Sequence, residues 1–268
     1  MHVSVLEEIC AGVTEDVASR AARLPLEDVK ALAALAAPVR DGYRALAASG
    51  VSVIAEVKRK SPSKGELAQI TDPAALASRY EAGGAAVISV LTEERRFGGS
   101  LADLDAVRAA VSIPVLRKDF MVTEYQFYEA RAHGADVVLL IVAALNDEEL
   151  ASFLGLSSSL GMTALVEVHS HDELLRATAA GATVIGVNAR NLKTLEIDPA
   201  LFCALAPEVP AVVNDVPVVL VAESGLFTAI DVAAAAACGA SAVLVGEALV
   251  RADDPAELIA QFRSGGLT

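Results

Sequence analysis

The sequence predicts an α/β fold, specifically a (β/α)8 TIM barrel with an N-terminal helical extension. Eight short apolar runs rich in β-branched residues recur along the chain, and stretches with helical periodicity separate them. The tripeptide Gly-Ala-X precedes several of these runs, which indicates that one helix–strand unit is repeated. The length of 268 residues is close to the ~250 residues that such a barrel needs.

The eight expected strands are apolar along nearly their whole length. They cover residues 51–57, 85–91, 113–119, 135–142, 162–168, 182–188, 217–224 and 241–247. Strands that are apolar on both faces are typical of a parallel sheet covered by helices. An open doubly wound sheet fits less well, because it would more often carry a glycine-rich nucleotide loop after its first strand, where this chain has KRKSPSKG.

The stretches between the runs are rich in Ala, Leu, Glu and Arg and have the helical period. The clearest of them cover residues 72–83, 101–110, 124–133, 147–160 and 171–180. A glycine just past a helical stretch is typical of a C-terminal cap. The glycines expected in this role are Gly83, Gly134, Gly161, Gly181 and Gly239.

Two further helices are expected before the first strand, over residues 3–22 and 26–36. Residues 1–46 are therefore expected to form an N-terminal extension that packs on the barrel. No linker or low-complexity stretch divides the chain, so residues 1–268 are expected to form a single domain. Only the stretch 206–216, before the seventh strand, lacks a clear pattern.

Composition excludes several classes of partner. With 21 Lys+Arg against 35 Asp+Glu, the net charge of -14 argues against a nucleic-acid partner, because the phosphate backbone favours a basic surface. No apolar run approaches the ~18 residues of a membrane helix, and the first residues lack the basic region of a signal peptide. Cys10, Cys203 and Cys238 lack metal-ligand spacing. They are expected to be reduced thiols in a cytoplasmic protein that binds no metal.

In barrels of this kind the active site lies at the C-terminal ends of the strands. Ionisable or amide side chains follow several of the apolar runs: Glu56, Lys58, Lys118, Glu167, Asn188, Arg190, Glu223 and Glu247. A single Lys or Glu at such a place is most often a solvated loop residue or a helix cap. Lysines and glutamates that converge on one barrel mouth instead indicate acid–base chemistry, because each charge shifts the pKa of its neighbours.

The loops after the seventh and eighth strands are expected to bind a phosphate group. They contain Glu223-Ser224-Gly225 and Gly246-Glu247, and glycine lets backbone amides approach phosphate oxygens. Ser61, Ser63 and Lys64 are expected to close this cup from the first strand's loop. The cations Lys58, Arg59, Lys60 and Lys64 would supply a local positive field in an acidic chain. Either glycine loop taken alone could be a structural turn.

A series of phrases, in chain order, resembles the indole-3-glycerol phosphate synthase family. They are VIAEVKRKSPSKGEL, VLTEERRFGGSLADL, IPVLRKDFMVTEYQ, ADVVLLIVAAL, ALVEVH, IGVNARNLKTLEID, VAESGL and AVLVGEAL. The resemblance runs from about residue 47 to residue 250 and extends to the N-terminal helices. It implies a barrel that needs no metal or organic cofactor. It also implies a phosphorylated small-molecule substrate, 1-(2-carboxyphenylamino)-1-deoxyribulose 5-phosphate, which undergoes ring closure, decarboxylation and dehydration in tryptophan biosynthesis.

The resemblance also implies roles for individual residues. Lys118 would be the general acid of ring closure, and Lys58 a second acid or a phosphate-side cation. Glu56 would be the base, and Glu167 would orient Lys118. The implied catalytic set is Glu56, Lys58, Lys118, Glu167, Asn188 and Ser224. The implied substrate-binding set is Ser61, Phe97, Phe120, Leu139, Arg190, Leu192, Glu223, Gly225, Gly246 and Glu247. Within this set Arg190 would take the aryl carboxylate. The two phenylalanines and the two leucines would form an apolar slot for the aryl ring.

Two other functions were weighed against this one. Another phosphate-binding barrel, such as a phosphoribosyl isomerase, would typically use Asp or Cys at the strand ends, where this chain has Glu and Lys. A catalytically silent barrel that only binds a sugar phosphate or a protein would have lost a catalytic Lys or Glu, and none is missing. Since the chain ends soon after its eighth strand, a monofunctional enzyme is expected. The protein is also expected to be a monomer.

Overall fold

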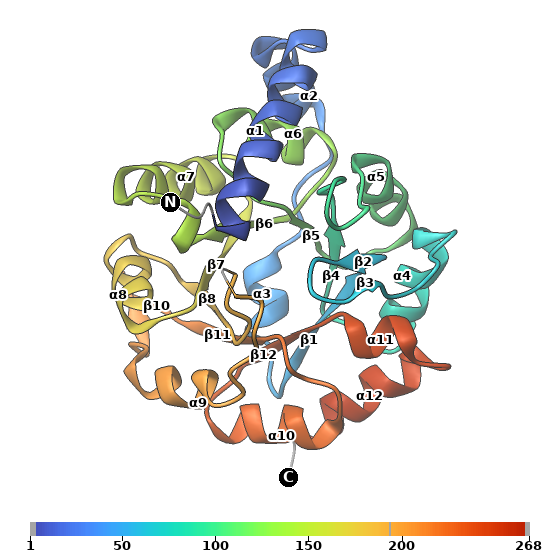
Figure 1. The fold of residues 1–268 in the computed structure, drawn as a ribbon, viewed down its shortest axis with the longest axis vertical. Helices are drawn as coiled ribbons and strands as arrows, with labels where there is room; N and C mark the ends of the chain where they lie inside the picture. Colours follow the sequence, from blue (N-terminus) through green and yellow to red (C-terminus); the bar gives the residue numbers. More distant parts are fainter. Residues whose placement is uncertain (1–3, 193, 266–268) are drawn as a thin grey trace.

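Eight parallel strands close into a barrel in this computed structural model, which describes residues 4–192 and 194–265 (Figure 1). The strands are β1 (Ser52–Val57), β4 (Val87–Leu91), β5 (Val115–Lys118), β6 (Val137–Ile141), β7 (Thr163–Val168), β8 (Val184–Asn188), β11 (Val219–Glu223) and β12 (Ala242–Val245). They follow one another around the barrel in chain order, and β1 pairs with both β4 and β12. The predicted barrel is confirmed, and each strand lies inside its expected range.

Side chains alternate between the two faces of each strand, as the period of two requires. The barrel interior contains Ile54, Val87, Leu116, Leu139, Leu165, Val184, Val221 and Leu244. The outer face packs a second set against the helices, including Val53, Ile88, Val138, Val166, Ile185 and Val243. Both faces are therefore buried, which accounts for the unbroken apolar runs in the sequence.

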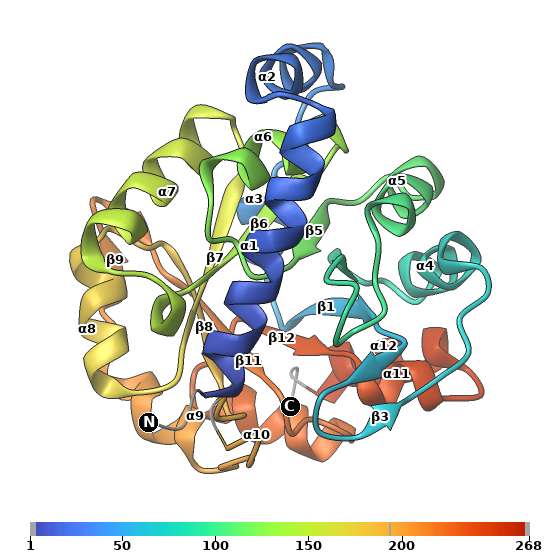
Figure 2. The ribbon, with the colours of Figure 1, turned by 45° about the horizontal axis from the view of Figure 1, so that its top comes forward.

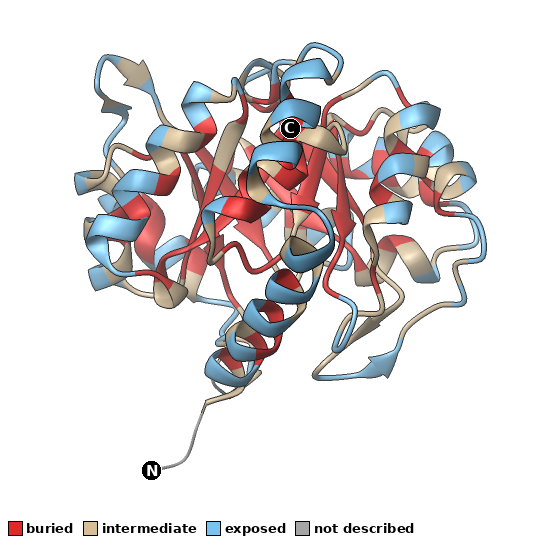
Figure 3. Ribbon diagram, turned by 90° about the horizontal axis from the view of Figure 1, so that it is seen from above, coloured by how far each residue is buried: buried red, intermediate tan, exposed pale blue. Residues whose placement is uncertain are grey.

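The helices surround the barrel, with their buried sides toward the strands and their exposed sides toward solvent (Figure 3). They are α4 (Pro73–Ala82), α5 (Leu101–Ala110), α6 (Glu124–Ala132), α7 (Asp147–Ser159), α8 (His171–Ala179), α9 (Leu201–Leu205), α10 (Ala229–Ala237), α11 (Glu247–Arg251) and α12 (Pro255–Gly265). The side chains of Asp72 and Ser100 cap α4 and α5 by accepting hydrogen bonds from backbone N–H groups of the first turn. Each helix predicted between strands is present, with ends within two residues of the expected ones.

Glycine ends five of these helices in the left-handed region that other residues avoid. Gly134, Gly161, Gly181 and Gly239 have φ of +77°, +76°, +93° and +105°, as predicted. At α4 the prediction was one residue off. Gly83 has a φ of -73°, and the left-handed residue is Gly84, at +90°. Gly83 is the C-cap, and the left-handed position is the residue after the cap, as at α6, where Gly134 follows His133. Gly83 instead lies against the backbone of Ala256, where a Cβ would be only 2.6 Å away.

The N-terminal helices are α1 (Val5–Arg23), α2 (Leu26–Leu35) and α3 (Gly42–Leu46). The expected helix over 3–22 includes residue 3, which lies outside the described residues. The short α3 contributes the fully buried Leu46 to the interior of the barrel. The long α1 runs across the molecule in front of the strands (Figure 2). Two ion pairs hold α1 against the rest of the protein: Glu8 of α1 contacts Arg96 at 2.8 Å, and Arg20 of α1 contacts Glu129 at 2.7 Å.

Two small hairpins interrupt the repeating pattern. The first, β2 (Lys60–Ser61) with β3 (Gly65–Glu66), lies in the loop after β1. The second, β9 (Val212–Val213) with β10 (Val216–Pro217), precedes β11 and follows the 3-10 turns η2 (Ala206–Glu208). The stretch without a clear sequence pattern is thus a turn and a hairpin, in which Asn214 and Asp215 take positive φ values.

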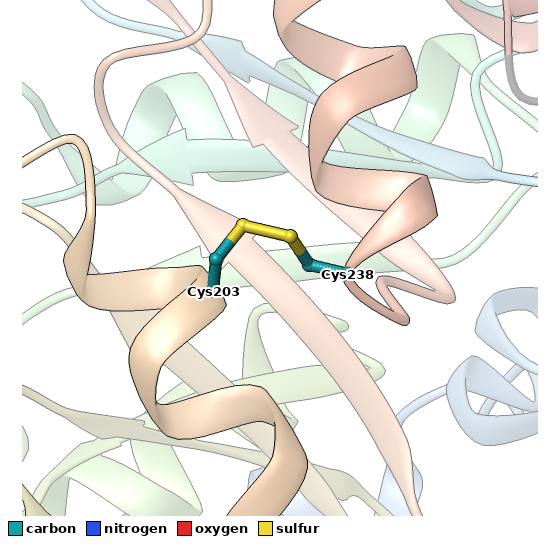
Figure 4. The surroundings of a disulfide bond; sticks show 2 residues. All are labelled: Cys203 and Cys238. Atoms are coloured by element: carbon teal, nitrogen blue, oxygen red, sulfur yellow. A yellow bond between two sulfur atoms is a disulfide. The ribbon is translucent and has the colours of Figure 1, made fainter.

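The prediction that all cysteines are free thiols is wrong for two of them. Cys203 in α9 and Cys238 at the end of α10 form a disulfide with a Cα–Cα distance of 5.2 Å (Figure 4). They are 35 residues apart in the sequence, so no local sequence motif predicts the disulfide. The fold joins them because α9 and α10 belong to consecutive β/α units and pack side by side. Cys10 is the remaining free thiol, and burial raises its pKa to about 11.

Breaking this disulfide is expected to destabilise the fold without abolishing activity. A cross-link over 35 residues restricts the unfolded chain and contributes about 2–4 kcal/mol. The variant Cys203→Ser should therefore melt at a lower temperature than the oxidised wild type, whereas reduced wild type should match the variant. The control is Cys10→Ser, which should melt like the wild type under both conditions. Equal melting of Cys203→Ser, oxidised wild type and reduced wild type would show that the disulfide does not form in solution.

Candidate active site

A cavity opens at the C-terminal ends of the barrel strands, where the sequence predicts the active site. Every residue expected in the site lines it: Glu56, Lys58, Ser61, Phe97, Lys118, Phe120, Leu139, Glu167, Asn188, Arg190, Leu192, Glu223, Ser224, Gly225, Gly246 and Glu247. These side chains come from the eight barrel strands and their loops, and parallel strands bring them together because their carboxyl ends meet at one end of the barrel.

Lys118, the last residue of β5, lies between two carboxyl groups. Its Nζ is 3.0 Å from Oε2 of Glu167 on β7 and 3.7 Å from Oε2 of Glu223 on β11. Burial is the largest influence on the amine and favours its neutral form. The carboxylates of Glu167, Glu223 and Glu56 together outweigh burial and raise the pKa of Lys118. The side chain is therefore an ammonium at neutral pH, held ready to donate a proton.

The two carboxyl groups beside Lys118 have opposite pKa shifts. Burial raises the pKa of both, but at Glu167 the charge of Lys118 and hydrogen bonds from His169 and Asn188 outweigh it and lower the pKa. At Glu223, burial and the adjacent charge of Glu167 act together, and the pKa is raised. Glu167 is thus the ionised member of the pair and Glu223 the protonated one. Two titratable groups with separated pKa values are typical of acid–base catalysis.

A glycine inside β8 makes room for Glu223, and sequence reasoning missed it. A Cβ on Gly186 would lie 2.0 Å from Oε1 of Glu223. Gly186 pairs with Glu167 on one side and Val221 on the other, so it lies level with the catalytic layer. The signal in the sequence was a glycine within a β-branched run, which often marks a close approach by another group.

Glu56 and Lys58 form an ion pair at the end of β1. Glu56 is buried, and its Oε1 lies 2.5 Å from Nζ of Lys58. The two residues are two positions apart and share the face of the strand that points into the barrel. Gly246 at the end of β12 adjoins the pair, and a Cβ there would lie 2.5 Å from Glu56 Oε1 and 3.1 Å from Lys58 Nζ. Gly246, expected only as a phosphate ligand, thus also makes room for these side chains.

An apolar side of the cavity faces the charged one. Phe97 and Phe120 lie with ring centroids 6.1 Å apart, and Leu139 and Leu192 complete the set expected from the sequence. The structure adds residues from the N-terminal extension: Val5, Leu6 and Ile9 of α1. Their spacing showed an amphipathic helix, but the sequence could not show which surface its apolar face covers.

The cation run after β1 does not act as one cluster. Only Lys58 lines the cavity, whereas Arg59 forms an ion pair with Asp103 of α5, and Lys60 donates to the backbone carbonyl of Arg95. Arg59 and Lys60 are therefore held by partners outside the cavity. A joint field of the four cations for phosphate stays a prediction.

The same hairpin reaches across the cavity mouth to other loops. Lys64 contacts Glu247 at 2.8 Å, and its ammonium lies 5.5 Å from the ring centroid of Phe227. Nη1 of Arg190 donates to Oγ of Ser63 at 3.0 Å. The loops after β1, β8 and β12 therefore meet over the cavity, as expected for a cup closed by Ser61, Ser63 and Lys64.

The loop after β11 has an unusual backbone. Ser224 has a φ of +67°, and Gly225, the next residue, has a φ of +77°. A left-handed conformation is costly for serine, and such strained residues cluster at ligand-binding and catalytic sites. The short helix α11 begins directly after Gly246, next to this loop in the barrel order.

A buried chain of charges lies behind Lys118, and sequence reasoning missed it as well. Arg117, which is fully buried, contacts Asp119 at 2.9 Å and Glu129 of α6 at 3.0 Å. Glu129 in turn binds Arg20 of α1. A buried arginine must be paired because an unpaired charge is costly in the interior. The chain of ion pairs thus links the N-terminal helix to the residues on either side of Lys118.

Two kinds of feature are absent from the described part of the chain. No helix there is both long enough and apolar enough to cross a membrane. Within residues 4–192 and 194–265, no three His, Cys, Asp or Glu residues are grouped so that they could hold a metal ion.

Comparison with known sequences gives extensive matches. The family model described as indole-3-glycerol phosphate synthase matches residues 6–262. Indole-3-glycerol phosphate synthase 1 of Streptomyces coelicolor is 61% identical over 264 residues, which cover 98% of this chain and 96% of that protein. Indole-3-glycerol phosphate synthase of Micrococcus luteus is 58% identical, with 99% of each chain covered.

Comparison with solved structures gives the same fold in more distant proteins. A 3-hexulose-6-phosphate synthase superposes with a TM-score of 0.63 over 80% of this chain and 99% of its own, at 19% identity. Another, from Salmonella typhimurium, has a TM-score of 0.65 at 14% identity, covering 81% of this chain and 99% of its own. At these identities the likeness concerns the fold alone.

Proposed function

The chain belongs to the indole-3-glycerol phosphate synthase family, and from this premise we propose how its cavity carries out the reaction of that family. The enzyme, a carboxy-lyase of tryptophan biosynthesis, converts 1-(2-carboxyphenylamino)-1-deoxy-D-ribulose 5-phosphate into indole-3-glycerol phosphate, carbon dioxide and water. The observation that carries the proposal is the position of Lys118, whose Nζ lies 3.0 Å from Glu167 and 3.7 Å from Glu223 in a cavity with an apolar side.

Ring closure is assigned to Lys118. As the aryl carbon attacks the ketone, the ketone oxygen gains negative charge, and the ammonium donates a proton to it. The carboxylate of Glu167 orients that ammonium and stabilises the positive charge that develops on the anilinic nitrogen. A positioned acid of this kind contributes about 10²–10⁴-fold to the rate. The aryl ring would occupy the slot of Phe97, Phe120, Leu139 and Leu192, where burial of its carboxylate favours departure as neutral carbon dioxide.

Dehydration is assigned to the pair on β1. Lys58 would protonate the departing hydroxyl, and Glu56 would remove the proton whose loss forms the indole double bond. The ion pair between them supports the assignment, because it keeps an ammonium and a carboxylate side by side at this edge of the cavity. Asn188, which donates to Glu167 and accepts from the backbone N–H of Arg190, would keep the carboxylate in place.

Substrate binding is assigned to the two ends of the cavity. Arg190 would take the aryl carboxylate in a two-point hydrogen bond, since its guanidinium already reaches the cavity and binds Ser63. The phosphate would lie on the backbone amides of Ser224, Gly225 and Gly246, with Ser61 above it. Glu247 lines this end as well, and its ion pair with Lys64 offsets its charge near a phosphate.

Crystals soaked in sulfate test where the phosphate binds. We expect the anion beside the Gly225 and Gly246 amides, because glycine leaves those N–H groups accessible. A Gly225→Val variant, which adds a side chain at a φ of +77°, should lose the anion and raise KM for the substrate. Sulfate density near α1 and α2, with none at these loops, would contradict the assignment.

The chain is further proposed to work as one domain and as a monomer, without a nucleic-acid partner. The support is that α1 and the barrel line the same cavity, that this cavity needs no residue from a second copy, and that the net charge is -14. A cytoplasmic location is proposed from the biosynthetic role. The Cys203–Cys238 disulfide argues against it, since disulfides are rare in the cytosol.

The decisive experiment for the function is incubation of the protein with the carboxyphenylamino sugar phosphate. Indole fluorescence should appear together with one equivalent of released carbon dioxide. Binding of the substrate without either signal would instead show a barrel that binds a sugar phosphate and catalyses nothing.

A further inference from the structure

A buried histidine contacts Glu167 on the side away from Lys118. His169 follows β7, two residues after Glu167, and only 9% of its side chain is exposed. It is absent from the residues that line the cavity, so it does not touch a ligand there. Its two ionic neighbours in the described part of the chain are Glu167 and Glu173.

The contacts of the imidazole fix its orientation. Its Nδ1 lies 3.1 Å from Oε2 of Glu173, and the same carboxylate oxygen accepts the backbone N–H of His169 at 2.7 Å. Glu173 is in the first turn of α8, which Ser170 caps. Because Nδ1 is bound to Glu173, Nε2 must face Glu167, whose Oε1 is 3.2 Å away and off the ideal hydrogen-bond direction.

Each oxygen of Glu167 therefore has its own cationic neighbour. Oε2 contacts Lys118, and Oε1 contacts His169. Burial alone would lower the pKa of His169, but hydrogen bonds and the charges of the two glutamates raise it to about 9. The ring is thus an imidazolium at neutral pH. The charge of His169 is also one of the causes that lower the pKa of Glu167.

Other groups near this contact do not supply the same charge. Beyond Glu167 lie Lys118, Glu223 and the uncharged Asn188. The 3-10 turn η1 (Val142–Ala144), packed against β7 and α8, has no ionisable side chain. Arg176 of α8 is bound to the carbonyls of Val142 and Leu145 and to Asp147.

We propose that His169 is a positioning residue of the reaction, which holds Glu167 ionised and turned toward Lys118 through a relay that begins at Glu173. The inference rests on the proposed function, because it assumes that Glu167 and Lys118 act together in ring closure. Without the imidazolium, the proton shared by Glu167 and Glu223 would move toward Glu167, and Lys118 would lose its orienting carboxylate. Partners that orient the ligands of metal sites contribute about 10–100-fold, and we expect an effect of similar size from a residue that orients a catalytic carboxylate.

The test compares His169→Gln with His171→Gln. Glutamine can still donate to Glu167 but has no charge. The control residue, His171, is a half-exposed histidine that pairs with Glu208 outside the cavity. For His169→Gln we expect kcat to fall about 10–100-fold with KM within a few-fold of wild type. The acid limb of the kcat–pH profile should move to higher pH, because loss of the positive charge raises the pKa of Glu167. His171→Gln should match the wild type in both respects.

Two measurements separate positioning from a structural role. If His169→Gln does not fold, His169→Asn, whose amide can still reach Glu173, is expected to show the same fall in kcat and the same shift. A lower melting temperature with an unchanged pH profile would overturn the inference, as would wild-type kcat in either variant. An inactive wild type would overturn the proposed function together with this inference, whereas an active wild type with unaffected variants overturns the inference alone.

Discussion

Replacement of Lys118 by alanine is expected to lower kcat by about 10²–10⁴-fold, the usual contribution of a positioned general acid. Substrate should still bind with nearly unchanged KM, because the phosphate loops and Arg190 remain. The loss is expected in the chemical step, since no other ammonium lies between Glu167 and Glu223 among the described residues. Single-turnover measurement of indole formation, with binding measured separately, checks both parts.

The matched control is Lys60→Ala. Lys60 lies on the same face of the molecule but bonds to the carbonyl of Arg95 and does not line the cavity. Removal of Lys118 also leaves Glu167 buried without its main partner, so thermal unfolding must show that the variant is folded at the assay temperature. A folded Lys118→Ala enzyme that retains more than about a tenth of wild-type turnover would exclude Lys118 as the acid of ring closure.

The second large effect is expected for Glu56→Gln. Glutamine keeps the shape of the side chain and its hydrogen bonding but removes both the base and the charge. We expect kcat to fall by about 10²-fold or more, with apparent substrate affinity changed far less. Glu66→Gln is the control, because Glu66 is an exposed residue of β3 in the loop that follows β1.

A structural role for Glu56 predicts a different pattern. If Glu56 only pairs with Lys58 to hold the loop after β1, the variant should melt at a lower temperature and keep turnover within a few-fold of wild type. Both quantities should be measured on one preparation. An active but less stable Glu56→Gln enzyme would show that Glu56 has a structural role and that another group is the base.

The sequence alone determined the fold of this protein. Runs such as 85–91 and 135–142 are too short and too apolar for surface strands, and each is followed by a helical stretch. Such a pattern buries its strands only in a parallel sheet with helices outside it. The sequence also placed the candidate residues at one end of the barrel, because parallel strands bring their carboxyl ends together wherever the intervening chain runs. It therefore predicts that Glu56, Lys118 and Glu167 share one cavity, and all three line it.

Tertiary structure alone decided which side chains touch. Several contacts join parts of the chain that are far apart in sequence, and the length of the intervening chain does not predict them. Examples are the contacts of Cys203 with Cys238, of Arg117 with Glu129, and of α1 with the apolar side of the cavity. The same holds within the site. The order of strands places Lys118 and Glu223 at one mouth, but Gly186 makes the space for Glu223, and the packing of α8 directs His169 at Glu167. Secondary structure follows from the pattern of neighbouring residues along the chain, so the sequence could indicate it. The pKa values of the site residues depend on burial and on distances between charged groups, and these are set only when the barrel has closed.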